Sequence, residues 1–268
     1  MAELHITSAT NARLRSVAAL RRRRVREEEG LTVVDGYDEL LLAVDSGVVP
    51  RTLLHCPELM LDAARQGELV DRVRALGATT IRCGRAAFEK VAYREGPDGF
   101  LAVVPAAGVA LADLSLPPDP LVVLVEGLEK PGNLGSVLRS ADAAGVAAVV
   151  AADPVTDWGN PNVVRASKGT VFSVPVAAAP LPEVLAWLRD NGIRLVATTP
   201  DTELLHTDAD LTGPVAVAVG TEKTGLSDAA LAAADARVRI PMAGAVNSLN
   251  AGVSAAVVLF EAVRQRSA

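Results

Sequence analysis

Hydrophobic residues occur along the chain in short blocks whose spacing switches between the period of a strand and that of a helix. In the first hundred residues, short segments of four or five residues with strand-like patterns predict strands at 31–34, 51–55, 79–83 and 100–104. Helical spacing predicts helices around them, at about 10–28, 38–47, 58–77 and 85–93. This alternation predicts a small α/β domain over residues 1–105.

From Leu121 onward the apolar runs become stronger. They read LVVLV, VAAVVAA, IRLVAT, VAVAV and ARVRI, and helical patterns separate them. Continuous apolar runs are typical of parallel strands that are buried on both faces of a sheet. Residues 121–268 are therefore predicted to form an α/β domain with a doubly wound parallel sheet, whose ligand lies at the carboxyl ends of the strands. The proline-rich stretch 106–120 predicts a linker between the two domains.

The composition is that of a globular chain. Half of the 268 residues are hydrophobic, which is enough for a substantial core, and no apolar run reaches the roughly 18 residues of a membrane-spanning helix. The start of the chain lacks the basic end and apolar centre of a signal peptide. Two cysteines and three scattered histidines predict neither a disulfide framework nor a metal site. We therefore expect a cytoplasmic protein without a membrane or metal partner.

Positive charge is concentrated in one short stretch, although the net charge of the chain is −6. Seven arginines and no acidic residue lie between positions 11 and 26, and three glutamates follow directly. One interpretation is a solvated helix whose Arg and Glu side chains pair at i,i+4. The other is a phosphate-binding face for a nucleic acid. The candidate residues for that face are Arg21, Arg22, Arg23 and Arg24.

A glycine-rich segment, residues 126–145, follows the first of the stronger strands. Its glycines do not match the G-x-G-x-x-G fingerprint, so the sequence does not indicate a dinucleotide-dependent oxidoreductase. Pro131 and Gly132 predict a turn, and Asn133 is expected to cap the helix that follows. Arg139 lies off the buried stripe of this helix and is expected to face the strand ends. The alternative is a surface arginine.

A second such segment, residues 220–228, imitates a phosphate-binding loop. Gly220 and Gly225 have the spacing of that loop, but Leu226 stands where a lysine is required, so a nucleotide triphosphatase is not indicated. The plainer interpretation is a turn in which Ser227 caps a helix. That interpretation leaves Glu222 without a role.

A third polar segment precedes the last helix of the chain. Asn247, Ser248 and Asn250 crowd the entrance of this helix directly after a strand. Capping explains one of the three, because the oxygen of a single side chain accepts a hydrogen bond from an otherwise unpaired backbone N–H. It does not explain all three.

Together these three segments resemble the motifs of a known family. They read N-x-G-x-x-x-R (Asn133, Gly135, Arg139), G-x-E-x-x-G (Gly220, Glu222, Gly225) and I-P-M-x-G-x-x-x-S-L-N (240–250). In this order they closely resemble the SpoU family, also called the TrmH family, of RNA ribose 2′-O-methyltransferases that use S-adenosylmethionine. The resemblance covers residues 121–265, including 160–176. The first hundred residues are similar, more loosely, to the L30e-like RNA-binding domain of ribosomal-RNA members.

The resemblance implies a deep trefoil knot in the carboxyl-terminal domain, which belongs to the SPOUT superfamily, and it implies a homodimer. It makes Arg139 the catalytic residue, either as a general base or as a group that stabilises the alkoxide. The second role does not require Arg139 to lose a proton, which matters because a guanidinium resists deprotonation in proteins. Residues implied to position the ribose, Arg139 and the methionyl part of the cofactor are Asn133, Ser248 and Asn250.

The implied cofactor site is built mainly from backbone. Its residues are Gly220, Ile240 and Leu249 by motif match, with Thr199, Glu222 and Met242 nearby. An alternative role for Glu222 is to brace the knot. Arg165 joins the arginine run as a candidate RNA-binding residue. Ala251 and Gly252 depart from the family, which usually has Val-Ser after S-L-N.

We therefore expect S-adenosylmethionine-dependent 2′-O-methylation of one ribose in RNA, with 23S ribosomal RNA of the large subunit as the substrate. Two alternatives stay open. One is a catalytically silent RNA-binding or ribosome-assembly module that has kept the fold, and the other is a transfer-RNA 2′-O-methyltransferase.

Overall fold

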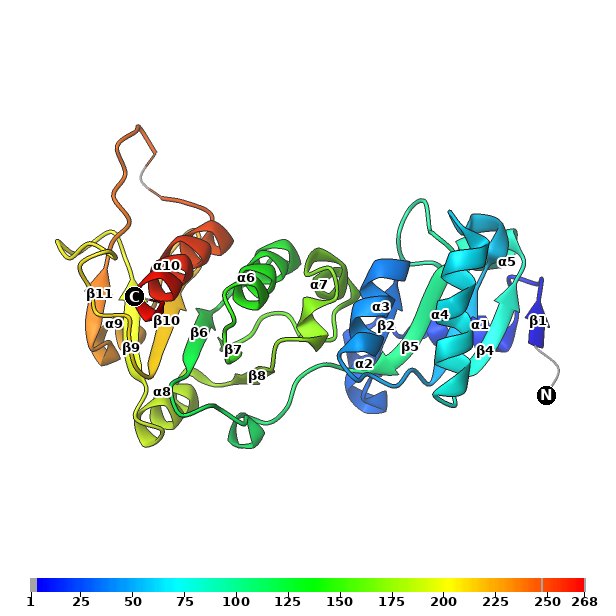
Figure 1. Ribbon diagram of the computed structural model, residues 1–268, viewed down its shortest axis with the longest axis horizontal. Coiled ribbons are helices and arrows are strands. Elements are labelled where there is room, and N and C mark those ends of the chain that lie inside the picture. The colour runs from blue at the N-terminus through cyan, green and yellow to red at the C-terminus, as the bar shows by residue number, and fades with distance from the viewer. Residues whose placement is uncertain (1–3, 247, 268) are drawn as a thin grey trace. The chain divides into compact units, whose positions relative to one another are not determined.

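The computed structural model describes residues 4–246 and 248–267 (Figure 1). Contacts divide the chain into two compact units. The first comprises Met1–Ala107 and Asp157–Ser173, and the second Gly108–Thr156 and Val174–Ala268. The sequence pattern did not indicate that residues 157–173 pack with the amino-terminal unit. The domain limits 1–105 and 121–268 stay a prediction.

The amino-terminal unit is built on a mixed five-stranded sheet. The strand order is β1 (Leu4–Ile6), β4 (Thr79–Cys83), β3 (Thr52–His55), β5 (Phe100–Pro105) and β2 (Leu31–Asp35). The first three strands run parallel, and β5 runs antiparallel to both of its neighbours. The helices of this unit are α1 (Ala12–Ala19), α2 (Arg23–Glu29), α3 (Tyr37–Asp45), α4 (Ala63–Ala75), α5 (Arg85–Val91) and α7 (Pro161–Ala166), with the short 3-10 helices η1 (Pro57–Leu59) and η3 (Thr170–Phe172). Apolar residues of α1 and α5 share one core with the sheet, as the alternating pattern predicts.

The single basic helix predicted for residues 10–28 is wrong, because the chain turns between α1 and α2. The guanidinium of Arg26 explains the turn. Its Nη1 donates to the carbonyl oxygens of Leu20 (3.1 Å) and Arg21 (2.9 Å), and thereby satisfies the end of α1. The same side chain is only 4 % exposed and forms an ion pair with Asp157 at 2.6 Å. Arg26 is therefore an internal residue of this unit.

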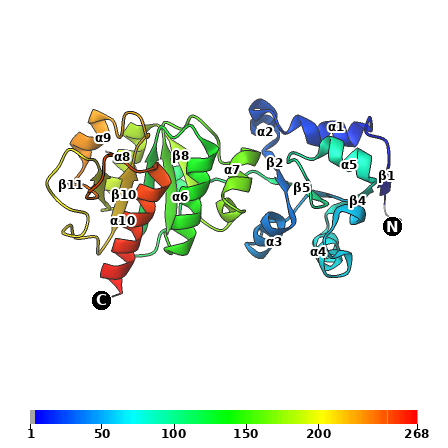
Figure 2. The ribbon, with the colours of Figure 1, turned by 90° about the horizontal axis from the view of Figure 1, so that it is seen from above.

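The carboxyl-terminal unit confirms the predicted parallel sheet. The strand order is β11 (Ala236–Val238), β9 (Arg194–Thr198), β10 (Val215–Val219), β6 (Leu121–Glu126), β7 (Ala148–Ala152) and β8 (Val176–Ala179), and all pairs are parallel. One face carries α8 (Leu181–Asp190), α9 (Asp228–Ala233) and the 3-10 helix η2 (Leu111–Asp113). The other face carries α6 (Pro131–Ala143) and α10 (Ala251–Arg266), which pack side by side (Figure 2).

The chain is threaded in this unit. Residues 194–214 form a ring, which is closed by a hydrogen bond from Arg194 N to Pro214 O (3.1 Å). Strand β11 lies inside this ring: it pairs with β9 on one side, and Arg239 exchanges backbone hydrogen bonds with Leu204 and His206 on the other. The chain reaches β11 from α9 on one face of the sheet and leaves it for α10 on the opposite face. It therefore passes through the ring, which is the threading expected of a SPOUT knot.

The far end of α10 fastens the ring to the rest of the unit. The side chain of Gln265 donates to Ala209 O (3.0 Å) and accepts from Leu211 N (2.8 Å). Hydrogen bonds from Arg264 and Gln265 also lower the pKa of Glu261 to about 2. The last turn of the helix is thus a polar cluster that holds residues 209–211 in place.

Candidate active site

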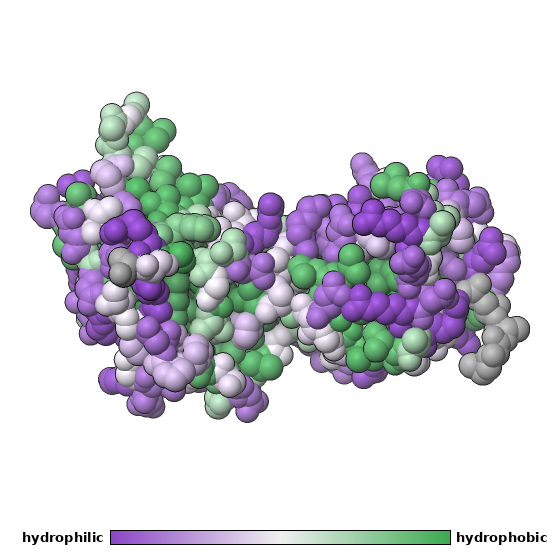
Figure 3. Space-filling model, in the orientation of Figure 1, coloured by the Kyte–Doolittle hydropathy of each residue, from purple (hydrophilic) through white to green (hydrophobic). Residues whose placement is uncertain are grey.

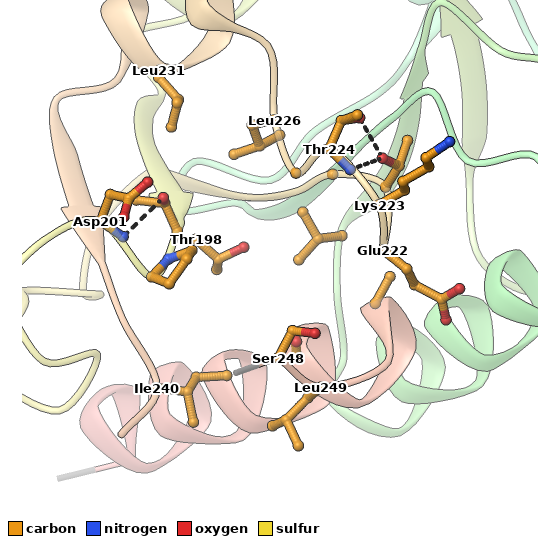
Figure 4. Close-up of a pocket in the computed structure, with 18 of the residues that line it drawn as sticks. Thr198, Asp201, Glu222, Lys223, Thr224, Leu226, Leu231, Ile240, Ser248 and Leu249 are labelled. Atoms are coloured by element: carbon orange, nitrogen blue, oxygen red, sulfur yellow. Dashed lines mark hydrogen bonds between the residues drawn. The ribbon is translucent and has the colours of Figure 1, made fainter. Parts of the chain in front are cut away.

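A cavity of about 470 Å³ opens at the carboxyl ends of β9 and β10 and beside the segment that follows β11 (Figure 4). This is the edge at which a doubly wound sheet is expected to bind its ligand. All of the residues predicted to contact the cofactor line it, namely Thr199, Gly220, Glu222, Ile240, Met242 and Leu249. Ser248 lines it as well. Three chain segments that are far apart in sequence therefore meet at one cavity.

The walls of this cavity combine aliphatic and polar groups. Figure 4 shows Leu226, Ile240 and Leu249 around the open space, with Asp201 on the β9 side. The volume falls within the range of roughly 300–1,000 Å³ that is typical of small-molecule sites. A wall that mixes aliphatic and polar groups suits a ligand that has a flat aromatic part and a polar tail.

The loop after β10 requires glycine at two positions. A Cβ on Gly220 would lie 2.2 Å from the backbone carbon and oxygen of Gly225, so only glycine permits this approach. Gly225 itself has φ +70°, and Thr221 and Gly225 exchange backbone hydrogen bonds of 3.1 and 3.0 Å. The loop is therefore a tight closed turn that presents backbone to the cavity.

Glu222 lies at the centre of a hydrogen-bond network that joins the three motifs. Its Oε1 accepts from Asn250 Nδ2 at 2.6 Å, and its Oε2 accepts from Lys130 Nζ at 2.9 Å. Asn250 Nδ2 also donates to Asn133 Oδ1 at 3.0 Å. The pKa of Glu222 is lowered, chiefly by the hydrogen bond from Lys130 and further by those from the two asparagines. This arrangement agrees with the alternative role of Glu222 as a brace.

Asn250 answers part of the question raised by the crowded helix entrance. Its Oδ1 accepts from Gly252 N at 2.9 Å and caps α10, while its Nδ2 donates to the network. Ser248 instead lines the cavity, and Asn247 lies outside the described residues. Asn250 therefore both caps the helix and joins the network, whereas Ser248 lines the cavity.

Asn133 does not cap α6, so that prediction is wrong. The helix begins at Pro131, with Lys130 as the residue that precedes it and no side-chain cap. Proline favours the first helical position because its fixed φ suits the helix and its missing N–H is not needed there. Asn133 consequently lies inside the first turn, where its side chain is available to Asn250.

Arg139 is placed apart from this cavity. It lies six residues after Asn133 on α6, a rise of about 9 Å along the helix. The side chain is exposed and does not line the cavity. Within the described part of the chain it makes no hydrogen bond or ion pair. The structure therefore places Arg139 on the surface of α6, apart from the residues that line the cavity.

The arginine run is largely engaged within the amino-terminal unit. Arg21 donates to the carbonyl oxygens of Val91 (3.0 Å) and Ala92 (2.6 Å), and its guanidinium lies over the ring of Tyr93. Arg23 and Arg24 form the i,i+4 pairs of the first interpretation, at 2.7 Å each, with glutamates 27 and 28.

Two other candidates for RNA contact are exposed. They are Arg22, which precedes α2, and Arg165 on α7. The RNA-binding role of all five arginines stays a prediction, and Arg22 and Arg165 have the side chains that are least engaged within the unit.

Sequence reasoning missed several residues at this site, among them Lys130, which contacts Glu222 without lining the cavity. Lys130 was not considered, although a lysine directly before the Pro-Gly-Asn turn was a signal for a cation near the motif. Asp201 lines the cavity and was also missed, because it lies in a loop without a recognisable pattern. Within the described residues, no three His, Cys, Asp or Glu side chains could hold a metal ion, and no helix is long and apolar enough to cross a membrane.

Comparison with known proteins decides the family. The SpoU rRNA Methylase family matches residues 120–260, which include all three motifs. The chain is also 36 % identical, over 97 % of its length and 92 % of the relative, to the 23S rRNA (uridine(2479)-2′-O)-methyltransferase of Streptomyces viridochromogenes. The chain belongs to the SpoU rRNA methylase family. The resemblance seen in the motifs is thereby confirmed.

Other matches extend this assignment over the chain. The MRM3-like substrate binding domain matches residues 11–102. The 23S rRNA (guanosine-2′-O-)-methyltransferase RlmB of Ralstonia nicotianae is 34 % identical over 78 % of this chain and 88 % of its own. Among solved structures, the SpoU methyltransferase AviRb from Streptomyces viridochromogenes in complex with AdoMet is 35 % identical, with a TM-score of 0.84 over 95 % of this chain and 98 % of that one.

Proposed function

We propose that this protein transfers the methyl group of S-adenosylmethionine to the 2′-oxygen of one ribose in 23S ribosomal RNA. As a family member it is an RNA ribose 2′-O-methyltransferase. The observation that carries the proposal is the cavity at the strand ends, where the second and third motifs meet beside the start of α6. The two relatives named above act on 23S ribosomal RNA, which supports that substrate over transfer RNA. We place the reaction in the cytoplasm.

The residues present fit S-adenosylmethionine. The cavity has the required size, its aliphatic walls from Leu226, Ile240 and Leu249 suit an adenine ring, and the turn at Gly220 brings backbone to its edge. Thr199 and Ser248 supply hydroxyl groups for the polar parts of the ligand. When bound, the cofactor supplies an electrophilic methyl group on a sulfonium.

The chain must prepare the ribose for the attack. With the cofactor bound, the 2′-hydroxyl oxygen would form a bond to the methyl carbon, the electron pair of the broken carbon–sulfur bond would stay on sulfur, and the hydroxyl proton would pass to water. We assign Arg139 to the phosphate and the developing alkoxide, because a guanidinium binds such oxygens with two parallel hydrogen bonds and remains charged. Its exposure and lack of an internal partner support this role.

We further propose that the protein is a homodimer whose two subunits contact each other through α10. Val253 and Phe260 on this helix are 46 % and 50 % exposed, and Val257 between them is half-buried. Figure 3 shows hydrophobic surface over this part of α10. A second copy is the occupant that we expect, because α6 packs directly against α10 and carries the exposed Arg139. Sedimentation of Phe260→Asp beside wild type tests this: a dimer that the substitution leaves intact would refute the interface.

Methyl transfer from labelled S-adenosylmethionine to unmodified 23S ribosomal RNA tests the reaction, with wild type beside Arg139→Ala. Mass mapping of nuclease fragments locates the product. Label on a single ribose that is lost in the variant supports the proposal. Label on transfer RNA alone would overturn the substrate. Absence of both transfer and cofactor binding would favour the silent RNA-binding module.

A further inference from the structure

Among the residues that the structure describes, Lys130 is the one cation in the network around Glu222, and the family motifs do not include it. It stands directly before α6, and its ammonium lies 2.9 Å from Glu222 Oε2. The side chain is 72 % exposed, whereas that of Glu222 is 33 % exposed. The contact joins residues 92 positions apart in sequence. It therefore ties the start of α6 to the turn after β10.

Both oxygens of the Glu222 carboxylate have assigned partners, and this fixes its orientation. Oε2 accepts from Lys130, and Oε1 accepts from Asn250. Figure 4 shows the side chain of Glu222 extending from the cavity wall toward α6. Loss of the ammonium removes the hydrogen bond to Oε2 and leaves the carboxylate held by the asparagines alone, so it can rotate and the bond to Asn250 loses its geometry.

The effect of that rotation reaches the cavity through short lengths of chain. Asn250 follows directly on Ser248 and Leu249, which line the cavity. Glu222 itself belongs to the tight turn whose backbone forms another wall. A carboxylate fixed at both oxygens therefore holds two walls of the cavity at a constant separation.

We infer that Lys130 is a positioning residue for the cofactor cavity, which holds Glu222 where it fixes Asn250 and the turn at residues 220–225. Lys130 does not touch the ligand in this role. The inference rests on the proposed function in so far as the ligand is S-adenosylmethionine. The geometry of the network itself does not depend on that identity.

The comparison of Lys130→Met with Lys130→Arg tests this role. Methionine keeps the aliphatic length and removes the charge, while arginine restores a donor of the same charge. The start of α6 is preserved in both, because the Lys130 side chain does not cap the helix. Lys223→Met is the matched control, since it removes one positive charge from the same turn and leaves the partner of Glu222 in place.

The first readout needs no ligand. The side-chain amide of Asn250 is followed by NMR from pH 3 to 8 as a reporter of Glu222. In wild type the pKa of Glu222 is lowered chiefly by Lys130, so removal of that donor raises it and moves the amide transition to higher pH. Lys130→Arg and the Lys223 control should titrate as wild type does. A transition that Lys130→Met leaves unmoved would refute the inference.

The second readout is the affinity for S-adenosylhomocysteine by calorimetry at pH 7. We expect Lys130→Met to weaken binding about twofold to fivefold, as for the loss of a largely exposed ion pair, and Lys130→Arg to restore it. Unchanged affinity in Lys130→Met would overturn the role at the cavity. If wild type itself does not bind the ligand, the proposed function fails, and the amide titration still decides whether Lys130 positions Glu222.

Discussion

Removal of the Arg26 side chain tests whether the arginine run is structural or binds RNA. The guanidinium makes two hydrogen bonds to Asp157, from Nε at 3.2 Å and from Nη2 at 2.6 Å, and two more to backbone carbonyl groups of the preceding turn. The arginine side chain is 4 % exposed and that of Asp157 is 19 % exposed. Loss of one partner of such a buried pair costs about 3–5 kcal/mol, and the more distant Arg23, at 3.9 Å from Asp157, compensates the remaining charge only in part.

The expected result for Arg26→Met is therefore a large loss of stability in the amino-terminal unit. At this size, 3–5 kcal/mol corresponds to a fall in the melting temperature of roughly 10–20 °C. The assay uses the two tryptophans, since Trp158 lies in the amino-terminal unit and Trp187 in the other. In a Trp187→Phe background, fluorescence follows the unfolding of the amino-terminal unit alone.

Two variants sharpen this measurement. Arg24→Met breaks an exposed i,i+4 pair and should change the stability by less than about 1 kcal/mol. The double variant Arg26→Met/Asp157→Leu replaces the buried pair by apolar groups and should recover much of the loss. If Arg26→Met leaves the Trp158 transition unmoved but weakens RNA binding, the structural interpretation of Arg26 is refuted.

Three further predictions concern other parts of the chain. Gly252→Ser should destabilise the carboxyl-terminal unit by about 1–3 kcal/mol in urea unfolding, because a Cβ at position 252 would lie 2.6 Å from the side chain of Ser136. Rescue by Ser136→Gly would confirm this cause, and an unchanged urea midpoint in Gly252→Ser would contradict the prediction. Arg165→Gln should reduce the slope of log affinity for ribosomal RNA against log salt by about 1, and an unchanged slope would remove Arg165 from the interface. The pKa of Glu261 is lowered to about 2, so its contribution to stability is present above about pH 4.5 and is lost as the pH falls toward 2. In Glu261→Gln, the free energy of unfolding should therefore fall less steeply between pH 4.5 and 2 than in wild type. An equal fall in both proteins would contradict this.

Much of the fold could be predicted from the sequence because its elements have strong local signals. The apolar runs from Leu121 predicted five of the six parallel strands, since a strand that is buried on both faces consists almost entirely of hydrophobic residues. The missed strand, Val176–Ala179, has only four residues, three of them alanine, and lies between Pro175 and Pro180. The break between α1 and α2 was missed for a different reason. It depends on Arg26 bonding back to the preceding turn and on Asp157, which is 131 residues away.

The candidate site was predictable in its residues but not in its geometry. All six residues that the sequence analysis assigned to the cofactor line the cavity, but other lining residues such as Asp201 were not named. It did not separate the bracing role of Asn250 and Glu222 from direct ligand contact, because that distinction depends on which atoms of an amide are already bonded. The position of Arg139 also follows from where Pro131 begins the helix, which local spacing did not reveal.

The ring of residues 194–214 and the strand inside it have a consequence for how the protein matures. The cavity walls come from the exit of β9, the turn after β10 and the chain just beyond β11, and they meet only after the carboxyl-terminal segment has passed through the ring. Nascent chains that have the sheet but not the threading should therefore lack the cavity. A ligand that binds only the threaded state shifts the equilibrium toward it by mass action. S-adenosylmethionine would then stabilise the threaded state as well as donate a methyl group, and its concentration would set the fraction of newly made chains that stays threaded.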